Sequence, residues 1–346
     1  MSIFLAQLLG ATLIALGKMH VRLLVLTAVL LITATACALY FVEAPSNDTV
    51  NNFGDCLWWA IVTMSTVGYG DKIPETVGGR AVATILAIGG PVIFLTMVSS
   101  VGATLYDEWR KGMRGEAQVH FKDHIMVCGW NPKAKDVINE LRLSPKFRKC
   151  PIVIIDDCID TKPIDNGDVA FVHGNAWEVE VLEQANVRKA KFAVVVASDE
   201  TSAADQKTVL TVLAIESIDP SIVTCAELND PNNEGHLRRA NCDVVVNTHV
   251  LTSKLLATAV ENRAVNDVID ELVTHTRGSE IYGVKLPRKY EASPFKEPFE
   301  ELKRSHNVTV IGVDRGGERL VNPSSDFVLQ AEDILLVISG GMPSLG

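Results

Sequence analysis

Apolar residues are distributed unevenly along this chain. Residues 21–42 and 79–106 form two long, nearly uncharged runs, whereas charged residues are frequent after residue 107. A helix needs about 20 apolar residues to cross the roughly 30 Å hydrocarbon core of a bilayer, and runs of this length are uncommon inside soluble domains. The pattern therefore predicts an outer transmembrane helix at 21–42 and an inner one at 79–106, followed by a soluble part.

The N-terminal segment differs from these two runs. Residues 1–20 carry a shorter apolar run that ends near Lys18 and His20. A cleavable signal peptide remains an alternative, but such peptides carry positive charge before the apolar run, and this segment does not. We therefore expect residues 1–20 to form a helix on the inner membrane surface.

The charges that flank the two runs predict the orientation. Lys18, His20 and Arg22 precede or open the first run, and Arg110, Lys111 and Arg114 follow the second. Positive charge collects on the cytoplasmic side of membrane proteins, although Lys72 and Arg80 lie on the other side here. The sequence thus predicts a multi-pass protein of the cell (inner or plasma) membrane with both termini and the soluble part in the cytoplasm.

A shorter apolar segment lies between the two runs. Residues 53–64, FGDCLWWAIVTM, cannot span a bilayer and are predicted to form a re-entrant pore helix, which STVGYGD at residues 65–71 follows. Non-helical backbone at membrane depth persists only where protein buries it or where it lines a watery path. Glycine permits the backbone angles that turn successive carbonyl groups the same way, so this stretch indicates an ion path.

The pentapeptide TVGYG, in this context, makes residues 21–107 resemble two-transmembrane potassium channels. Such channels surround an axis with four copies of this loop, whose carbonyl oxygens replace the hydration shell of K⁺. The resemblance implies a homotetramer in the lipid bilayer. It implies a filter of Thr66, Val67, Gly68, Tyr69 and Gly70, supported by Trp58, Trp59 and Asp71. A non-selective cation channel is the alternative, and Tyr69 argues against it.

The inner run contains a second unusual motif, Gly89-Gly90-Pro91. Glycine weakens a helix by about 1 kcal/mol and proline removes a backbone hydrogen bond, so the motif is a candidate gating hinge. Small residues also allow helices to pack closely. The sequence leaves both interpretations open.

Beyond residue 122 the pattern changes to short apolar runs that alternate with helical segments. The predicted strands are 124–129, 151–157, 169–174, 192–198, 222–228 and 242–247, and residues 132–142 and 201–217 are two of the helices between them. This alternation predicts a parallel sheet with helices on both faces.

This half resembles the regulator-of-K⁺-conductance (RCK) domains. The matching pieces are VCGWN, IIDD, FVHGNAWEVEVLEQANVRKA and VVVASDE. The resemblance implies a linker at 107–122, a Rossmann-like N-lobe at 123–248, linking or dimerisation helices at 249–276 and a C-terminal lobe at 277–346. The predicted fold is thus an α-helical membrane pore joined to an α/β Rossmann-like RCK domain with a small α+β C-terminal lobe.

The first strand of the soluble half ends where a dinucleotide fingerprint would begin. Only the first glycine of that fingerprint is present, and the second strand ends in two acids that could bind a ribose. The candidate residues for NAD or ADP are Gly129, Trp130, Asn131, Asp156, Asp157, His173, Gly174, Asn175, Ala197 and Ser198. A doubly wound domain without nucleotide remains the alternative.

Calcium-gated relatives suggest a second ligand. Asp205 and Glu227 match two of the calcium-binding positions of such relatives, but Cys225 stands where another acid is expected. Ca²⁺ takes six or more oxygen ligands, and a thiol is a poor substitute. These two acids therefore remain candidates for Ca²⁺, with ordinary solvated acids as the alternative.

Together these features predict a K⁺-selective channel whose inner helices are gated by ligand binding to a cytoplasmic ring of paired RCK domains. By the resemblance such rings usually contain eight domains, whereas this chain encodes one. Either an extra soluble RCK copy starting at Met113 joins the ring, or the natural chain continues past Gly346, and the sequence leaves both open. The alternatives are an NAD-binding regulatory subunit of a transporter, which residues 21–107 contradict, and an NAD-dependent oxidoreductase, for which the sequence offers no catalytic set. We expect no enzyme activity, and the net charge of −10 argues against nucleic acid as a partner.

Overall fold

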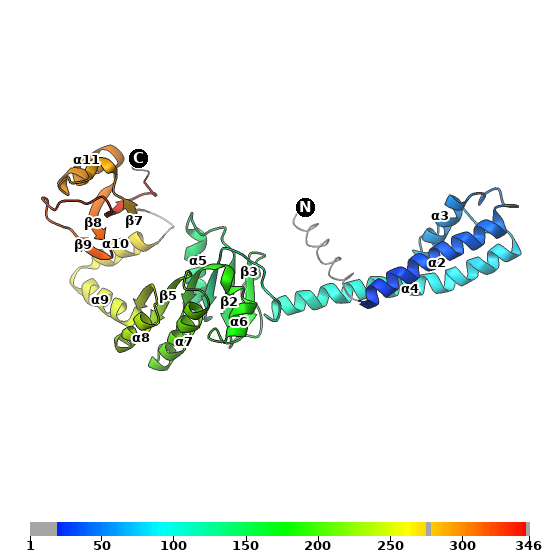
Figure 1. The fold of residues 1–346 in the computed structure, drawn as a ribbon, viewed down its shortest axis with the longest axis horizontal. Coiled ribbons are helices and arrows are strands. Elements are labelled where there is room, and N and C mark those ends of the chain that lie inside the picture. Colours follow the sequence, from blue (N-terminus) through cyan, green and yellow to red (C-terminus); the bar gives the residue numbers. More distant parts are fainter. Residues whose placement is uncertain (1–18, 275–277, 344–346) are drawn as a thin grey trace. The chain divides into compact units, whose positions relative to one another are not determined.

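The computed structural model describes residues 19–274 and 278–343. Residues 1–18 of the predicted N-terminal helix therefore lie outside the described residues. The chain divides into two compact units, Met1–Met113 and Arg114–Gly346, which are treated separately below (Figure 1).

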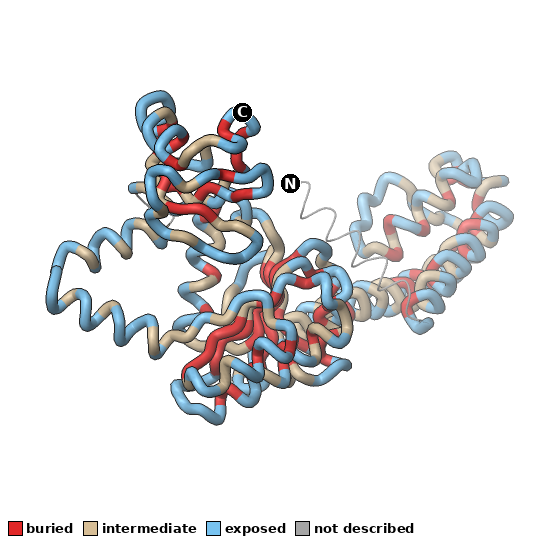
Figure 2. Tube along the Cα trace, turned by 60° about the vertical axis from the view of Figure 1, so that its left-hand side comes forward, coloured by how far each residue is buried: buried red, intermediate tan, exposed pale blue. Residues whose placement is uncertain are grey.

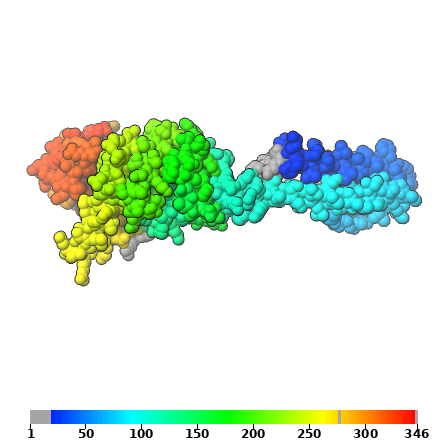
Figure 3. Space-filling view, turned by 90° about the horizontal axis from the view of Figure 1, so that it is seen from below, coloured from blue at the N-terminus to red at the C-terminus, as the bar shows by residue number. Residues whose placement is uncertain are grey.

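The described residues of the first unit form three helices: α2 (Met19–Glu43), α3 (Phe53–Met64) and α4 (Val77–Met113). Helix α2 lies along α4, and the short α3 packs against both (Figure 3). The buried positions Val21, Ala28 and Thr35 recur at seven-residue intervals along α2, a spacing that keeps one side of a helix against its neighbour. Both α2 and α4 are long and apolar enough to cross a membrane.

Helix α4 extends further than the predicted inner helix, which we expected to end at residue 106. It continues to Met113. Residues 107–113 stay helical because oppositely charged side chains lie one turn apart: Asp107 pairs with Arg110 at 3.1 Å and with Lys111 at 3.3 Å. The first part of the predicted linker is therefore the last part of the helix.

The second unit begins with a six-stranded parallel sheet. Its strands are β1 (His124–Cys128), β2 (Ile152–Asp156), β3 (Val169–His173), β4 (Ala190–Val195), β5 (Val223–Leu228) and β6 (Val244–Asn247), in the order β3-β2-β1-β4-β5-β6. The chain reverses its direction of strand addition between β1 and β4. Ligands of doubly wound sheets bind at this point, beyond the carboxyl ends of the strands.

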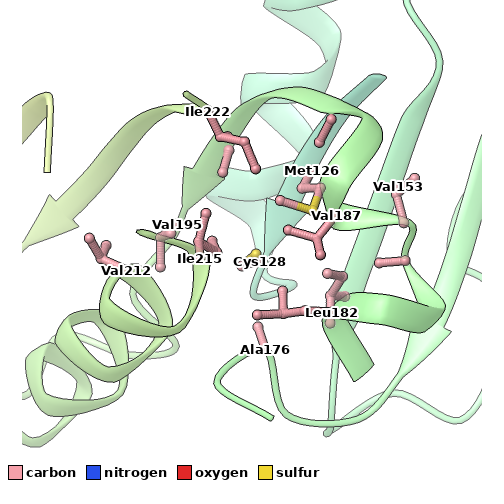
Figure 4. Packing of buried hydrophobic residues seen from close by; sticks show 14 of the residues in the cluster. Met126, Cys128, Val153, Ala176, Leu182, Val187, Val195, Val212, Ile215 and Ile222 are labelled. Atoms are coloured by element: carbon pink, nitrogen blue, oxygen red, sulfur yellow. The ribbon is translucent and has the colours of Figure 1, made fainter. Parts of the chain in front are cut away.

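Helices cover both faces of this sheet, which explains its continuous apolar strands. Met126 and Cys128 of β1 face a core shared with α6 (Val179–Gln184) and α7 (Ser202–Ile218), where Leu182 and Ile215 are fully buried (Figure 4). The alternate residues Ile125 and Val127 face the opposite core. There they pack with Ala134 and Ile138 of α5 (Pro132–Leu143).

After β5 the chain forms the short helix α8 (Glu234–Arg239), and after β6 it forms α9 (Thr248–Glu261) and α10 (Arg263–Val273). Neither α9 nor α10 has a buried residue (Figure 2). Large apolar side chains lie exposed on them, including Leu256, Val260 and Val273. Faces of this kind are typical of surfaces that another chain covers.

The C-terminal lobe is a four-stranded antiparallel sheet with one long helix. It contains β7 (Glu280–Lys285), α11 (Lys296–His306), β8 (Thr309–Arg315), β9 (Glu318–Val321) and β10 (Ile334–Ser339), in the strand order β7-β10-β8-β9. Its core includes Tyr290, Leu302 and Val313. The predicted fold class is confirmed: two long apolar helices with a short helix between them, a Rossmann-like domain and a small α+β lobe.

Candidate functional site

The short helix α3 positions the TVGYG loop. Asn52 caps its N-terminus by accepting a hydrogen bond from the Asp55 N–H at 2.9 Å. Cys56 and Ala60 anchor one face of the helix in the interior of the unit. The helix ends at Met64, and the N–H of Ser65 donates to the Ile61 carbonyl at 2.9 Å. The TVGYG loop therefore begins at the end of a helix that is fixed by its cap and by its buried side chains.

The sign of the φ angle alternates along residues 66–70. Thr66, Gly68 and Gly70 have positive φ angles of 60°, 58° and 74°. Such angles suit glycine and strain a β-branched residue such as Thr66. The alternation turns successive peptide groups to the same side, which is the geometry a row of carbonyl ligands requires. All five residues are exposed in the single chain, with Tyr69 at 68%.

The predicted support residues Trp58, Trp59 and Asp71 all lie beside the loop. The Trp58 ring stacks on Tyr69 with 5.9 Å between centroids and 1° between planes. The Trp58 indole N–H also donates to Asp71 Oδ2 at 3.0 Å. Trp59 packs against the small core that contains Leu39 and also lines the pocket formed by Gly68, Tyr69, Gly70 and Asp71. Within one chain, Trp58 thus contacts both Tyr69 and Asp71, and Trp59 packs on the side of the loop that faces the core.

The sequence interpretation missed a buried carboxylate behind this loop. Glu43, the last residue of α2, has no exposed surface. Its two oxygens accept hydrogen bonds from the Glu75 N–H (3.0 Å), the Thr76 N–H (2.9 Å), the Thr76 hydroxyl (2.6 Å) and the Asn47 amide (2.7 Å). Glu43 therefore fastens the connection between the TVGYG loop and α4 to the end of α2. Its signal in the sequence was an acid at the end of a long apolar run.

The Gly89-Gly90-Pro91 motif lies within the continuous helix α4. A Cβ built on Gly90 would lie 3.2 Å from Leu86 Cδ1 and 3.3 Å from Met64 Cα, whereas a Cβ on Gly89 would meet nothing within 4 Å. Gly90 thus permits the close approach of α4 to the end of α3, as the packing interpretation requires. The hinge remains a prediction.

In the second unit, the turn after β1 is tightly closed. Gly129 has φ +95°, and a Cβ there would lie 2.5 Å from the Val196 carbonyl oxygen. Asn131 caps α5 by accepting from the Ala134 N–H at 3.0 Å, and its amide donates to the Ala197 carbonyl at 2.8 Å. The turn therefore ties β1 to the end of β4.

The two acids after β2 differ in their surroundings. Asp156 is buried and accepts hydrogen bonds from the N–H groups of Trp130 (2.7 Å), Cys158 (2.8 Å) and Ile159 (3.1 Å). Asp157 is exposed. Both line a cavity of about 40 Å³ beside Gly129, together with Gly174 and Ser198.

The other nucleotide candidates have structural partners. His173 Nδ1 lies 3.0 Å from the Ile159 carbonyl oxygen, and the Asn175 amide donates to Glu178 at 2.8 Å. Buried Ala197 donates its N–H to Glu227 Oε2 at 3.0 Å. The structure thus gathers five of the ten candidates around the cavity, namely Gly129, Asp156, Asp157, Gly174 and Ser198.

The two calcium candidates are already hydrogen-bonded. Asp205, fully buried at the start of α7, accepts from the N–H groups of Asn229 and Asp230 at 2.9 Å each. Glu227 accepts from Lys133 Nζ at 2.9 Å as well as from Ala197. Within the described ranges, the close grouping of metal-ligating atoms is Asp156, Asp157 and Cys158, and it includes neither candidate.

Comparisons with known protein families define the class of protein. Residues 25–107 match the ion channel family, residues 125–248 the TrkA-N domain and residues 297–340 the TrkA-C domain. The chain therefore combines an ion-channel domain with an RCK-type domain, and two long apolar helices mark it as a membrane protein.

Its homologues include prokaryotic potassium channels with RCK domains. The calcium-gated potassium channel TvoK of Thermoplasma volcanium is 26% identical over 295 residues, which cover 84% of this chain and 83% of that protein. Potassium channel protein 1 of Methanocaldococcus jannaschii is 25% identical over 298 residues, covering 82% of this chain and 85% of that protein.

Among solved structures, the GsuK channel bound to NAD is similar with a TM-score of 0.50 at 19% identity. The match covers 91% of this chain and 56% of that one, so this chain spans little more than half the length of the solved channel. A similarity at this level of identity shows the fold alone. The function must be argued from the residues of the site.

Proposed function

We propose that this protein is the subunit of a K⁺-selective channel whose opening is controlled by ligands of its RCK domain. The observation that carries the proposal is the alternating backbone of Thr66, Gly68 and Gly70, held between two membrane-length helices. Four such loops around an axis would present rings of carbonyl oxygens to a dehydrated K⁺ ion. The potassium channels among its homologues support this function.

The assembly we propose is a homotetramer in the cell membrane, with both termini and the RCK domain in the cytoplasm. The exposure of Tyr69 and Val67 on one chain supports this assembly, since neighbouring copies would cover them. The exposed apolar faces of α9 and α10 support pairing of RCK domains into a ring, to which additional RCK copies would contribute. We propose the domain boundaries expected from the sequence, except that the inner helix runs on to Met113.

The gating ligand we propose is a nucleotide bound beside Gly129, because that cavity lies where the sheet reverses its strand order. Similarity to a channel solved with NAD supports this choice. Ca²⁺ at Asp205 and Glu227 is a second candidate, supported by the calcium-gated homologue. A ligand that prefers one ring conformation would shift the gate by its differential affinity for the two states. We propose no catalytic activity.

The test is the reversal potential of the purified full chain in planar bilayers with K⁺ and Na⁺ on opposite sides. We expect it to follow K⁺. Gly70→Ala places a side chain at φ +74° and should abolish the K⁺ preference, whereas Gly102→Ala, in the open helical part of α4, should preserve it. A wild-type reversal potential indifferent to the K⁺ gradient would refute the proposed filter. NAD, ADP and Ca²⁺ are then added to the cytoplasmic side, and open probability is recorded.

A further inference from the structure

Lys72 is an exception to the positive-inside pattern of this chain. It follows Asp71 directly and lies two residues after Gly70, the last residue of the TVGYG loop. Residues 71–76 connect this loop to the end of α4 opposite Met113, so in the proposed topology they lie at the outer entrance of the ion path. A positive charge fixed at this entrance would repel the K⁺ ions that the proposed filter admits.

The structure pairs the charge of Lys72 with an acid of α3. Lys72 Nζ lies 3.1 Å from Asp55 Oδ1, and the two side chains are only 29% and 19% exposed. Lys72 also lines a cavity of about 210 Å³, together with Trp59 and Val62 of α3. These contacts direct the lysine side chain toward α3.

Asp55 is held in place for this contact. Its N–H donates to Asn52 Oδ1 at 2.9 Å, and its Oδ2 accepts a hydrogen bond from the Asn52 amide at 2.9 Å. Asp55 also lies in the first turn of α3, where the helix dipole favours a negative charge. Oδ1 of a fixed carboxylate therefore faces the ammonium of Lys72.

Two consecutive residues after the loop are thus tied to the same helix. Asp71 Oδ2 accepts a hydrogen bond from the Trp58 indole N–H at 3.0 Å, and Lys72 pairs with Asp55. Asp55 and Trp58 are three positions apart, so they are neighbours on one face of α3. The Trp58 contact fixes the chain where it leaves the loop, and Asp55 then sets the direction of the Lys72 side chain.

We propose that Asp55 is a positioning residue for conduction, which holds the Lys72 ammonium against α3 and out of the path of entering K⁺. The inference rests on the proposed K⁺ channel and concerns its outer entrance. While the pair is formed, its two charges cancel. Without Asp55 the ammonium is free to turn toward Gly70, because two residues span at most about 7 Å of chain. Four copies would then present four positive charges to an entering ion.

The repulsion expected from these charges depends on ionic strength. At a distance of about 12 Å in water, four unit charges lower the local concentration of a monovalent cation roughly fivefold in about 0.01 M salt. In about 1 M salt the Debye length falls to about 3 Å, and the effect disappears. A disturbed loop would instead lower conductance at both salt concentrations. The salt dependence therefore separates the position of the charge from a purely structural role.

The test measures single-channel conductance for K⁺ entering from the loop side, with the full chain in planar bilayers and about 0.01 M or about 1 M KCl. Asp55→Asn should lower conductance roughly fivefold at the lower concentration and leave it unchanged at the higher. Asp55→Glu retains the carboxylate and should behave as wild type. Lys72→Met should change conductance little, and adding it to Asp55→Asn should restore the wild-type value.

Glu75→Gln is the matched control, because it removes an equal charge from the same connection without releasing a lysine. Its effect should be the same with and without Lys72→Met, whereas the effect of Asp55→Asn should require Lys72. Equal effects of Asp55→Asn in both backgrounds, or a loss at both salt concentrations, would overturn the inference and leave the K⁺ channel intact. A wild type without K⁺ selectivity would overturn the proposed function together with the inference.

Discussion

At the scale of single residues, adjacent glycines of α4 have different surroundings. Gly90→Ala introduces a methyl group 3.2–3.4 Å from Leu86 and Met64, and overpacking of this kind costs about 1–3 kcal/mol. Gly89→Ala meets open space and should gain up to about 1 kcal/mol of helix propensity. We expect Gly90→Ala to lower, and Gly89→Ala to maintain or raise, the thermal stability of the detergent-solubilised protein. Equal losses of open probability with unchanged stability would instead favour the hinge.

A second residue-scale prediction concerns the C-terminal lobe. Arg315 donates two hydrogen bonds to buried Asp333, at 2.8 and 2.7 Å, and holds the pKa of that carboxyl below its usual value. Arg315→Met leaves a buried charge without its partner and should destabilise the lobe by about 3 kcal/mol. Arg319→Met removes an exposed pair with Asp314 and should cost about 1 kcal/mol or less. Hydrogen exchange of β8 and β10 measures both.

The pH dependence of this pair follows from the direction of the shift. The pKa of Asp333 is lower in the folded lobe than in the unfolded chain. The stabilisation of the folded lobe by this carboxylate is therefore fully present above the unfolded pKa of about 3.9, and it is lost as pH falls through the folded pKa. The hydrogen-exchange protection that this pair gives β8 and β10 in the wild type should thus be constant between neutral pH and about pH 4. It should decline below about pH 4. Loss of the difference between wild type and Arg315→Met near pH 6 would contradict the assignment.

At the scale of elements, Glu43 decides how the filter loop is joined to α4. Glu43→Ala leaves the N–H groups of Glu75 and Thr76 without their acceptor, at about 1–3 kcal/mol for each buried donor. We expect faster hydrogen exchange across residues 71–79 and earlier loss of K⁺ current on heating. Glu75→Ala, an exposed acid in the same loop, is the control and should leave both unchanged. Comparable exchange in the two variants would show that Glu43 is dispensable.

The sequence predicted elements well where burial on both faces dictates composition. Residues 125–128, 152–155 and 192–195, in β1, β2 and β4, are all apolar because helices cover both faces of the sheet. Within residues 279–340 the sequence predicts three short strands, at 280–286, 308–316 and 333–339. It misses β9, which is short and largely exposed, although the Gly316-Gly317 turn, with φ angles of 60° and 92°, is typical of a tight hairpin. The apolar sequence pattern of an exposed edge strand is weaker than that of a strand buried on both faces.

Site geometry was predictable only where one segment contains it. The proposed filter is one contiguous segment, and its two glycines indicate the positive φ angles found at Gly68 and Gly70. Two partners of Glu43, Glu75 and Thr76, lie 32 and 33 residues away, and one partner of Asp156, Trp130, lies 26 residues away. Nothing in the local pattern separates Asp156, a buried brace, from Asp157, an exposed neighbour. Such distinctions require the tertiary structure.

At the scale of the whole chain, the connection between membrane and RCK units is shorter than the predicted linker. Helix α4 ends at Met113, and Gly115 is already bound in the second unit: its carbonyl accepts from His173 N at 3.1 Å and from the Gln184 amide at 2.8 Å. Val119 is buried and donates its N–H to the Gln184 carbonyl at 2.9 Å. Only Arg114 separates the helix from the first anchored residue, so little slack can absorb a movement of the RCK unit.

Inserting a flexible segment between Arg114 and Gly115 should therefore prevent ligand binding to the RCK unit from changing the opening of the gate. Six Gly/Ser residues add a coil of roughly 13 Å root-mean-square length, which would absorb a displacement that the native connection transmits. We expect K⁺ selectivity and nucleotide binding to persist while the ligand-dependent change in open probability is lost. The same insertion between Gly316 and Gly317, in an exposed hairpin, should leave the response intact. A full ligand response with the first insertion would mean that coupling passes through contacts between the units, and the chain connection would then serve only as a tether.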